Sequence, residues 1–300
     1  MSLVIIGSLA FDTIETPLGR REGVVGGSAT YCALAASYFT RPRLVGVVGE
    51  DFPASVIDLF QQRKIDLTGL ERRKGRTFHW EGRYGRDPNQ RLTIKLELNV
   101  FQDFRPVLPR KYRLARNIFL ANIDPDLQEE ILRQVTQPRL VAMDTIDHWI
   151  KTKREALLRV LKKVNIFFAN DEEAKLLTEE INLIRAGRQI QKFGPELVII
   201  KKGEHGALVF GSDWIFGVLA HPCEEVIDPT GAGDCFAGGF LGYLDRSRQL
   251  NSRVVKRAAV YGSVMASLAI EDFGIERLKA LDSETIKKRF LEFKRLVTFS

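Results

Sequence analysis

Short apolar runs alternate with amphipathic stretches along most of the chain, and this alternation is the feature that most constrains its fold. The runs have the length of buried strands, whereas intervening segments such as residues 28–39 and 54–64 carry apolar residues at helical spacing. Strands that alternate with helices form a mostly parallel sheet covered by helices on both faces. The sequence therefore predicts an α/β fold for residues 1–300, organised as a single domain. The predicted strands are residues 3–6, 44–48, 118–121, 140–143, 166–169 and 197–200.

Two segments interrupt the alternation. Residues 12–25 are polar and punctuated by glycine, and residues 75–98 carry strand-forming residues on both sides of a turn cluster at residues 85–89. We expect these two segments to form together a small antiparallel β flap, a lid inserted in the main domain. Towards the end the pattern becomes helical, with predicted helices at residues 252–270 and 283–299.

Charge and composition narrow the class of partner. The chain has 45 Lys and Arg against 38 Asp and Glu, a net charge of +7. This modest positive charge is compatible with an anionic small molecule as well as with nucleic acid. No other feature of the sequence suggests that the protein binds nucleic acid. The sequence lacks the glycine-rich fingerprints of P-loop and dinucleotide-binding proteins. We therefore expect a small-molecule ligand and no nucleic acid.

The apolar runs and the cysteines bear on the compartment. No run approaches the roughly 20 apolar residues that a membrane helix needs. The first residues lack the basic region and the cleavage site of a signal peptide. Three cysteines, an odd number without metal-site spacing, favour a reduced protein. We expect a cytoplasmic protein that makes no membrane contact.

The segment with the most specific chemistry is residues 225–240, EVIDPTGAGDCFAGGF. A short apolar run enters a turn of small residues, and a helix is predicted to start near Ala232 or Gly233. Glycine lets the backbone approach a ligand, and free N–H groups at a helix start suit a phosphate. Asp234 would repel that phosphate unless it has another task, and a general base for an attacking hydroxyl is such a task. The alternative is that Asp234 only stabilises the first helical turn.

The stretch DPTGAGD at residues 228–234, followed by FAGGF at 236–240, resembles the C-terminal signature of the ribokinase-like (PfkB) family of sugar and nucleoside kinases. The resemblance implies that Asp234 is the catalytic base. It also implies that Gly231, Ala232 and Gly233 form the anion hole for the transferring phosphoryl group. Asp228 and Thr230 fall where some members bind a monovalent cation such as K⁺, and Thr230 borders the nucleotide.

The resemblance also covers the substrate side. Gly26, Gly27 and Ser28, before an Ala-rich helix, are similar to the N-terminal signature, whose glycines lie under the sugar. Family members bind sugar hydroxyls through an aspartate at the place of Asp12, and their other hydroxyl-binding positions fall near Asn122 and Asp124; Asp144 and Asp147 have weaker support. Each of these residues also fits a plain turn or helix cap. Ribokinases have Lys at position 28, and the family has Asn near position 31, where this chain has Tyr; both departures argue against ribose as the substrate.

The resemblance finally implies a nucleotide and metal side. Asn170 and Glu173 match an Asn-x-x-Glu motif that organises Mg²⁺ and phosphate, partly through water, although the same residues suit a helix start. Gly203 and Gly206 match the nucleotide loop. Lys201 before them can neutralise a phosphate or lie in solvent. Ser263, in a helix of small residues, falls where the family packs adenine or simply where two helices meet.

Taken together, the sequence predicts a kinase that transfers the γ-phosphoryl group of ATP, or of another NTP, to a hydroxyl of a small sugar, polyol or nucleoside with the help of Mg²⁺. The lid would close over the acceptor and exclude water, and relatives suggest a homodimer formed through it. The alternative is a non-catalytic nucleotide or sugar sensor on the same fold.

Overall fold

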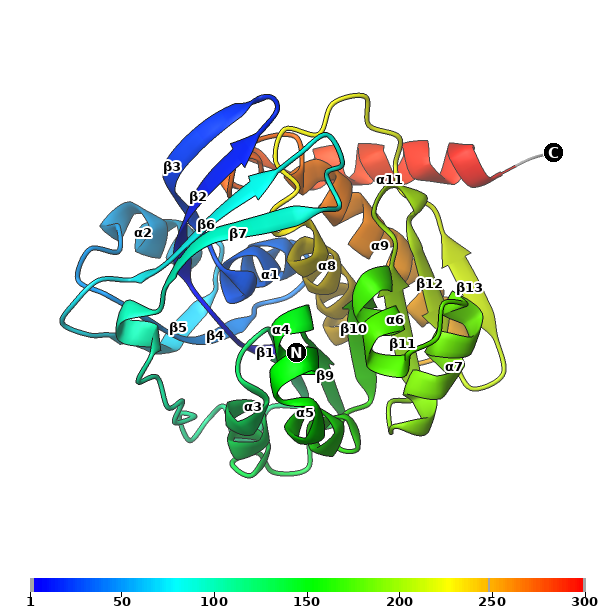
Figure 1. Ribbon diagram of the computed structural model, residues 1–300, viewed down its shortest axis with the longest axis horizontal. Helices are drawn as coiled ribbons and strands as arrows, with labels where there is room; N and C mark the ends of the chain where they lie inside the picture. Colours follow the sequence, from blue (N-terminus) through cyan, green and yellow to red (C-terminus); the bar gives the residue numbers. More distant parts are fainter. Residues whose placement is uncertain (1–2, 248, 299–300) are drawn as a thin grey trace.

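The computed structural model describes residues 3–247 and 249–298 and contains a large central sheet in the described chain (Figure 1). Its nine strands lie in the order β13-β12-β11-β10-β9-β8-β1-β4-β5. Neighbours are parallel from β11 to β5, and β12 and β13 extend the sheet as an antiparallel edge. The predicted α/β class is therefore confirmed. In sheet order the strands are Ile215–Val218, Ala207–Phe210, Leu197–Lys201, Ile166–Asn170, Leu140–Asp144, Asn117–Leu120, Leu3–Ile6, Arg43–Val48 and Asp66–Arg72.

Helices cover both faces of this sheet because each central strand is apolar on both sides. Leu3 and Ile5 point into one core, and Val4 and Ile6 point into the other. The first core is covered by α1 (Ser28–Ser37), α2 (Ala54–Gln62), α8 (Ala232–Arg246), α9 (Ser252–Ala269), α10 (Glu276–Ala280) and α11 (Ser283–Val297). The second is covered by α3 (Pro125–Leu132), α4 (Asp147–Thr152), α5 (Arg154–Leu161), α6 (Asp171–Thr178) and α7 (Leu183–Lys192).

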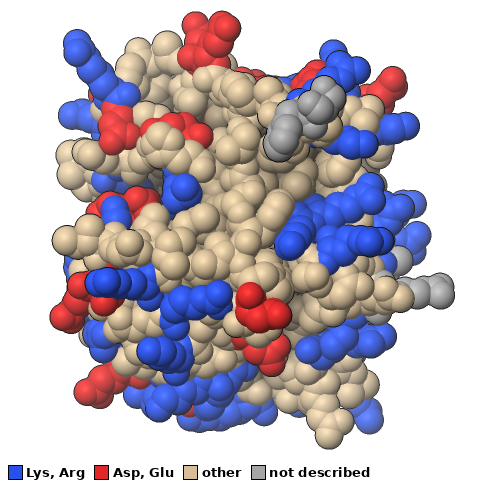
Figure 2. All heavy atoms as spheres, turned by 90° about the vertical axis from the view of Figure 1, so that its right-hand side faces the viewer, with Lys and Arg blue, Asp and Glu red and all other residues tan. Residues whose placement is uncertain are grey.

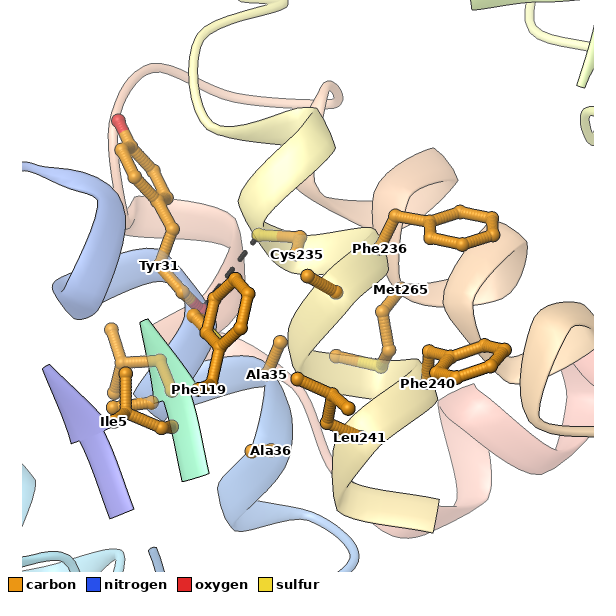
Figure 3. Close-up of a cluster of buried hydrophobic side chains, with 14 of the residues drawn as sticks. Ile5, Tyr31, Ala35, Ala36, Phe119, Cys235, Phe236, Phe240, Leu241 and Met265 are labelled. Atoms are coloured by element: carbon orange, nitrogen blue, oxygen red, sulfur yellow. Dashed lines mark hydrogen bonds between the residues drawn. The ribbon is translucent and has the colours of Figure 1, made fainter. Parts of the chain in front are cut away.

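The close packing of α1 against α8 positions two helix starts at the same end of the molecule (Figure 3). A Cβ on Gly238 would overlap the carbonyl oxygen of Cys32, and one on Gly242 would lie 3.0 Å from the Cα of Ala36. The glycines of α8 therefore let the two helix backbones touch. Because the helices run parallel, the N-termini of α1 and α8 lie side by side.

The lid is a second, four-stranded sheet in the order β3-β2-β6-β7. Its strands are β2 (Ala10–Thr16), β3 (Gly19–Gly26), β6 (Phe78–Tyr84) and β7 (Arg91–Glu97), which lie where the lid was predicted. Two antiparallel hairpins, β2–β3 and β6–β7, join through a parallel pair between β2 and β6. The first strands of the hairpins run in the same direction because both leave the same edge of the parallel main sheet.

Some elements of the fold differ from those predicted from the sequence. The strands β5, β12 and β13 were not predicted; β5, DLTGLER, mixes polar and apolar residues at an edge of the sheet. The predicted C-terminal helix ends at Val297, and Phe299 lies outside the described residues. Within residues 3–247 and 249–298, no helix combines the length and the apolar character needed to cross a membrane.

Surface charge is mixed on the face shown in Figure 2. Among the described residues drawn there, Lys and Arg side chains are interspersed with Asp and Glu and with uncharged surface.

Candidate active site

The start of α8 forms an anion-binding geometry. Gly231 precedes the helix in the left-handed region with φ of 74°, and a Cβ there would overlap the ring of Tyr31. Only glycine therefore fits this position. The first N–H groups of a helix have no partner within it and carry the positive end of the helix dipole. Within the predicted trio, the N–H of Ala232 already donates to the carbonyl oxygen of Pro229 at 3.2 Å. The N–H groups of Gly231 and Gly233 are therefore the members of the trio that can donate to an anion.

A lysine lies directly beside these donors. Lys201 is the last residue of β11, and its Nζ is 2.7 Å from the point where a Cβ on Gly233 would sit. The absence of a side chain on Gly233 therefore leaves room for the ammonium group. Of the two predicted possibilities for Lys201, the structure favours contact with the anion-binding turn over a position in solvent.

Asp234, in the first turn of α8, has an unusual proton affinity. Burial raises the pKa of its carboxyl group to about 6, and the positive charges of Lys201 and Arg91 oppose that rise. A carboxylate with a pKa close to neutral is well suited to accept a proton from a hydroxyl. Asp234 therefore lies at a helix start, under the electrostatic influence of two cations, with a pKa suited to a base.

Arg91 reaches this place from the lid. It pairs with Tyr84 across the β6–β7 hairpin, and residues that pair directly share one face of a sheet. The Tyr84 hydroxyl lies 3.1 Å from Oγ1 of Thr230, so this face of the lid looks onto the approach to α8. Arg91 was not predicted as a site residue, because nothing in its local sequence distinguishes it from other surface arginines.

Two further carboxyl groups surround Lys201. Asp144, at the end of β9, is buried, and its Oδ1 has no hydrogen-bond partner among the described residues. Burial and then the charge of Asp234 raise the pKa of Asp144. Burial also raises the pKa of Glu173, and Lys201 opposes the rise. The ammonium of Lys201 is therefore the positive centre of an acidic cluster.

The charge of Lys201 has a testable consequence for pH dependence. In its predicted role of catalytic base, Asp234 has to be ionised to accept a proton, so we expect kcat/KM to fall as the pH drops below about 6. Lys201→Met removes a positive charge that favours the ionised form, so the pKa of Asp234 should rise and the acid limb should move to higher pH. A pH profile of kcat/KM measures both positions.

Lys202→Met, which removes the same charge one residue further along, is the control and should leave the limb in place. A limb that stays fixed in Lys201→Met would show that Lys201 does not act on Asp234.

The predicted substrate residues at the N-terminal signature do come together. Asp12 is buried on β2, accepts a hydrogen bond from the backbone N–H of Gly27, and fills the space that a Cβ on Gly26 would need. Burial, and then the charges of Asp228 and Asp234, raise the pKa of Asp12. The acids of the two signatures therefore lie within electrostatic reach of each other.

Ser28 has a local task at the start of α1. Its backbone N–H donates to Oγ of Ser8 at 3.1 Å, and the two hydroxyl oxygens lie 3.2 Å apart. The predicted substrate residue is thus buried and already paired.

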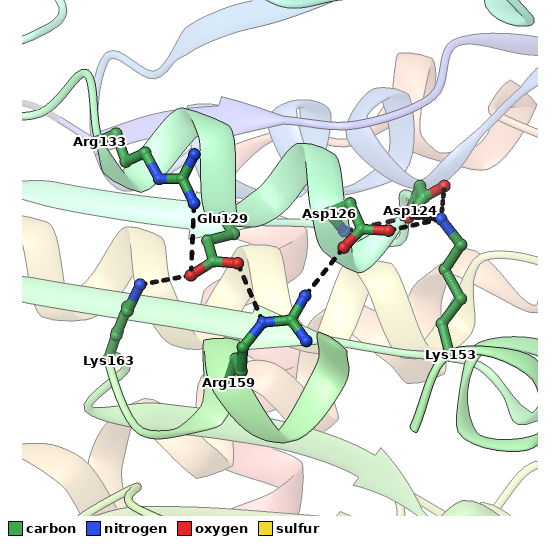
Figure 4. Close-up of polar contacts among 7 residues, drawn as sticks. All are labelled: Asp124, Asp126, Glu129, Arg133, Lys153, Arg159 and Lys163. Carbon is green, nitrogen blue, oxygen red and sulfur yellow. Dashed lines mark hydrogen bonds and ion pairs between the residues drawn. The ribbon is translucent and has the colours of Figure 1, made fainter. Parts of the chain in front are cut away.

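The two residues predicted after β8 differ. Oδ1 of Asn122 accepts a hydrogen bond of 2.9 Å from Nε1 of Trp149 on α4. Asp124 instead caps α3 by accepting from the N–H of Asp126 at 3.0 Å, and it pairs with Lys153 at 2.7 Å in an ion network (Figure 4). The structure does not bring Asp124 to the other site residues, and the alternative of a helix cap describes it.

The Asn-x-x-Glu motif forms a capping box at the start of α6. The Glu173 N–H donates to Oδ1 of Asn170 at 2.7 Å, and the Asn170 N–H donates to Oε2 of Glu173 at 2.8 Å. The cap thus uses one oxygen of the buried Glu173 and holds that side chain in the acidic cluster. Mg²⁺ prefers oxygen ligands such as carboxylates, so the chemistry of the Glu173 side chain fits this metal.

Asp228 is buried, and its two oxygens accept from the backbone N–H groups of Thr230 and Gly274, each at 2.8 Å. These bonds fix the turn that leads into α8. The carboxylate is the residue predicted for a monovalent cation.

The predicted nucleotide loop touches the tip of the lid. Gly203 and Gly206 both have positive φ, 53° and 77°, around a short helical turn. Nδ2 of Asn89, from the tip of the β6–β7 hairpin, donates to Oε2 of Glu204 at 2.6 Å, and a Cβ on Gly203 would overlap the Asn89 side chain. The lid is thus closed onto this loop.

Ser263 is the last predicted nucleotide residue. It is buried on α9, and its hydroxyl donates to the carbonyl of Leu219 at 2.7 Å. The structure therefore gives the predicted nucleotide residue a contact within the protein.

The architecture and these residues define a kinase class, and comparison with known proteins gives the family. The model of the pfkB family of carbohydrate kinases matches residues 2–279. The chain belongs to this family, whose members transfer phosphate to a hydroxyl group and use ATP with Mg²⁺.

Several relatives are named nucleoside kinases. A cytidine kinase of Thermococcus kodakarensis is 32% identical, with 85% of this chain and 92% of that protein aligned. A nucleoside kinase of Methanothermobacter thermautotrophicus is 24% identical over 95% of this chain and 94% of its own length. The crystal structure of a Methanocaldococcus jannaschii nucleoside kinase superimposes with a TM-score of 0.77 at 18% identity, covering 97% of this chain and 98% of that one. This likeness shows the ribokinase fold.

Proposed function

We propose that this kinase is an ATP-dependent nucleoside kinase that works as a single domain with its lid closed over the acceptor. The observation that carries the proposal is the position of Asp234 at the start of α8, with Lys201 and Arg91 acting on its carboxylate. A base, backbone N–H donors and two cations then meet where a phosphoryl group would move from ATP to a hydroxyl.

The residues act in sequence. The acceptor hydroxyl gives its proton to Asp234 as its oxygen attacks the γ-phosphorus of ATP, and the bond between that phosphorus and the β,γ-bridging oxygen breaks, so that ADP leaves. The negative charge of the transferred group is stabilised by the N–H groups of Gly231 and Gly233, by Lys201 and by Arg91. Lid contacts at Asn89 and Tyr84 keep water out, so that water does not replace the acceptor.

Magnesium would supply further charge compensation for the phosphates when bound. Glu173 is the residue we propose to hold it, directly or through water. Its capping-box bond to the Asn170 N–H keeps the carboxylate oriented toward the acidic cluster.

The lid supports a nucleoside as the acceptor. Asp12 pairs directly with Trp80 across β2 and β6, so the two side chains share one face of the lid. The Trp80 ring lies across Gly82, because a Cβ on Gly82 would overlap it. A carboxylate for sugar hydroxyls beside a flat aromatic ring suits a ribose joined to a base. The cytidine kinase relative agrees with this assignment.

An ADP-release assay tests the acceptor. Cytidine, uridine, adenosine, inosine, ribose and fructose are each offered with ATP, and we expect a nucleoside, with cytidine first, to have the highest kcat/KM. Trp80→Ala should raise KM for the nucleoside roughly 10-fold, since stacking a base is worth about 1–3 kcal/mol, while any turnover of ribose should change little. A free sugar that exceeds every nucleoside would rule out the proposed acceptor class.

A further inference from the structure

Tyr31, in the first turn of α1, is a buried polar side chain without an evident task. Its relative exposure is 1%, and its hydroxyl has no hydrogen-bond partner among the described residues. Buried hydroxyls are normally paired, because leaving one unpaired destabilises the folded protein. A phenylalanine would pack the same ring without that cost. The hydroxyl therefore calls for an explanation outside packing.

The ring of Tyr31 lies between the apolar core and the anion-binding turn. A Cβ on Gly231 would overlap the ring, and the Tyr31 carbonyl oxygen accepts a contact of 3.9 Å from Sγ of Cys235. In Figure 3 the side chain extends away from the clustered apolar residues, with its hydroxyl at the far end. The hydroxyl therefore lies outside the apolar core, near the start of α8.

The groups around this hydroxyl are acceptors of hydrogen bonds. Burial, followed by the charges of Asp12 and Asp228, raises the pKa of the Tyr31 phenol, so it stays protonated and can donate. Asp228 already accepts two backbone N–H groups, and the Tyr84 hydroxyl already pairs with Thr230. Asp12, on the lid, is the remaining acidic neighbour and the residue proposed to receive substrate hydroxyls.

We propose that the Tyr31 hydroxyl donates a hydrogen bond to the substrate hydroxyl that itself donates to Asp12, which makes Tyr31 a specificity-determining residue for acceptors that carry this hydroxyl. This inference rests on the proposed function. One hydroxyl group donates through its hydrogen and accepts through its oxygen, so it satisfies both protein groups at once. An acceptor that lacks it leaves the buried Tyr31 hydroxyl unpaired and leaves Asp12 with only its bond from the Gly27 N–H, and sites of this kind discriminate strongly.

The test compares Tyr31→Phe with the wild type on the best acceptor from the screen and on its 2′-deoxy and 3′-deoxy analogues. We expect kcat/KM for the parent acceptor to fall about 10- to 100-fold in Tyr31→Phe, mainly through KM. For the one analogue that lacks the recognised hydroxyl, the two enzymes should differ by less than about threefold, because the wild type has already lost that bond. The melting temperature of Tyr31→Phe without ligand should be equal to or above that of the wild type.

Thr30→Val is the matched control. Thr30 also has a buried, unpaired hydroxyl and is adjacent in α1, but it points about 100° further around the helix. The Thr30→Val substitution should leave the ratio of kcat/KM between the parent and deoxy acceptors unchanged.

Equal losses of Tyr31→Phe on the parent and on both analogues, or no loss at all, would overturn the inference. A change confined to K⁺ activation would also overturn it, since the hydroxyl would then serve a cation near Asp228. The comparison separates the two proposals: if a free sugar is the best acceptor, the nucleoside assignment fails, while the same series with that sugar and its deoxy analogues still decides the role of Tyr31.

Discussion

Replacing Asp234 by Asn should lower kcat by roughly two to four orders of magnitude, the range for loss of a general base. The amide keeps the shape of the side chain and cannot accept the proton of the attacking hydroxyl. Stability should be unchanged or higher, because burial disfavours the charged carboxylate that is removed. Steady-state kinetics with a saturating nucleoside and a thermal melt of the same sample measure both effects.

A matched variant separates catalysis from helix stabilisation. Asp126 also lies in the first turn of a helix, α3, and belongs to the ion network of Figure 4. Asp126→Asn should leave kcat unaltered. If Asp234→Asn instead kept full turnover and melted at a lower temperature, Asp234 would be a helix-stabilising residue and the assigned role would be wrong.

Replacing Arg91 by Ala should lower kcat about 100-fold, with a change in KM for ATP of less than about threefold. Arginines aimed at a transferring phosphoryl group contribute up to 10³–10⁵ in rate, and here Lys201 shares the task. Arg91→Lys should recover part of the loss, since it restores the charge without the planar fork. Initial rates at varied ATP and acceptor concentrations separate kcat from KM.

Arg83 is the control for Arg91, because it lies on the same hairpin. Its Nε is 3.0 Å from Oε1 of Glu15, and about half of its side chain is exposed. Arg83→Ala should keep kcat near the wild-type value. Equal effects of the two substitutions would mean that the hairpin needs its charge for folding, and a loss in Arg91→Ala confined to KM for ATP would mean that Arg91 binds the ground state.

Much of the site is local in sequence and was therefore predictable. The segment 228–234 contains the proposed base and the proposed anion-binding backbone close together in sequence, and the helix does start at Ala232. Asn170 and Glu173 are three residues apart, so their reciprocal cap was visible as a helix start. Asp124 could not be assigned in this way, because an aspartate after a strand is equally suited to cap a helix or to bind a substrate hydroxyl. The ion pair with Lys153, a residue distant in sequence, shows that Asp124 is engaged away from the site.

The sequence by itself determined the alternation of strands and helices and the kinase signature, and it proposed the base, since each depends on residues a few positions apart. The tertiary structure alone decided which distant groups act on that base. Lys201 meets Gly233 because β11 ends beside the start of α8, and Arg91 acts on the charge of Asp234 because its lid hairpin also approaches the start of α8. Such meetings depend on the packing of whole elements, which no short stretch of sequence encodes.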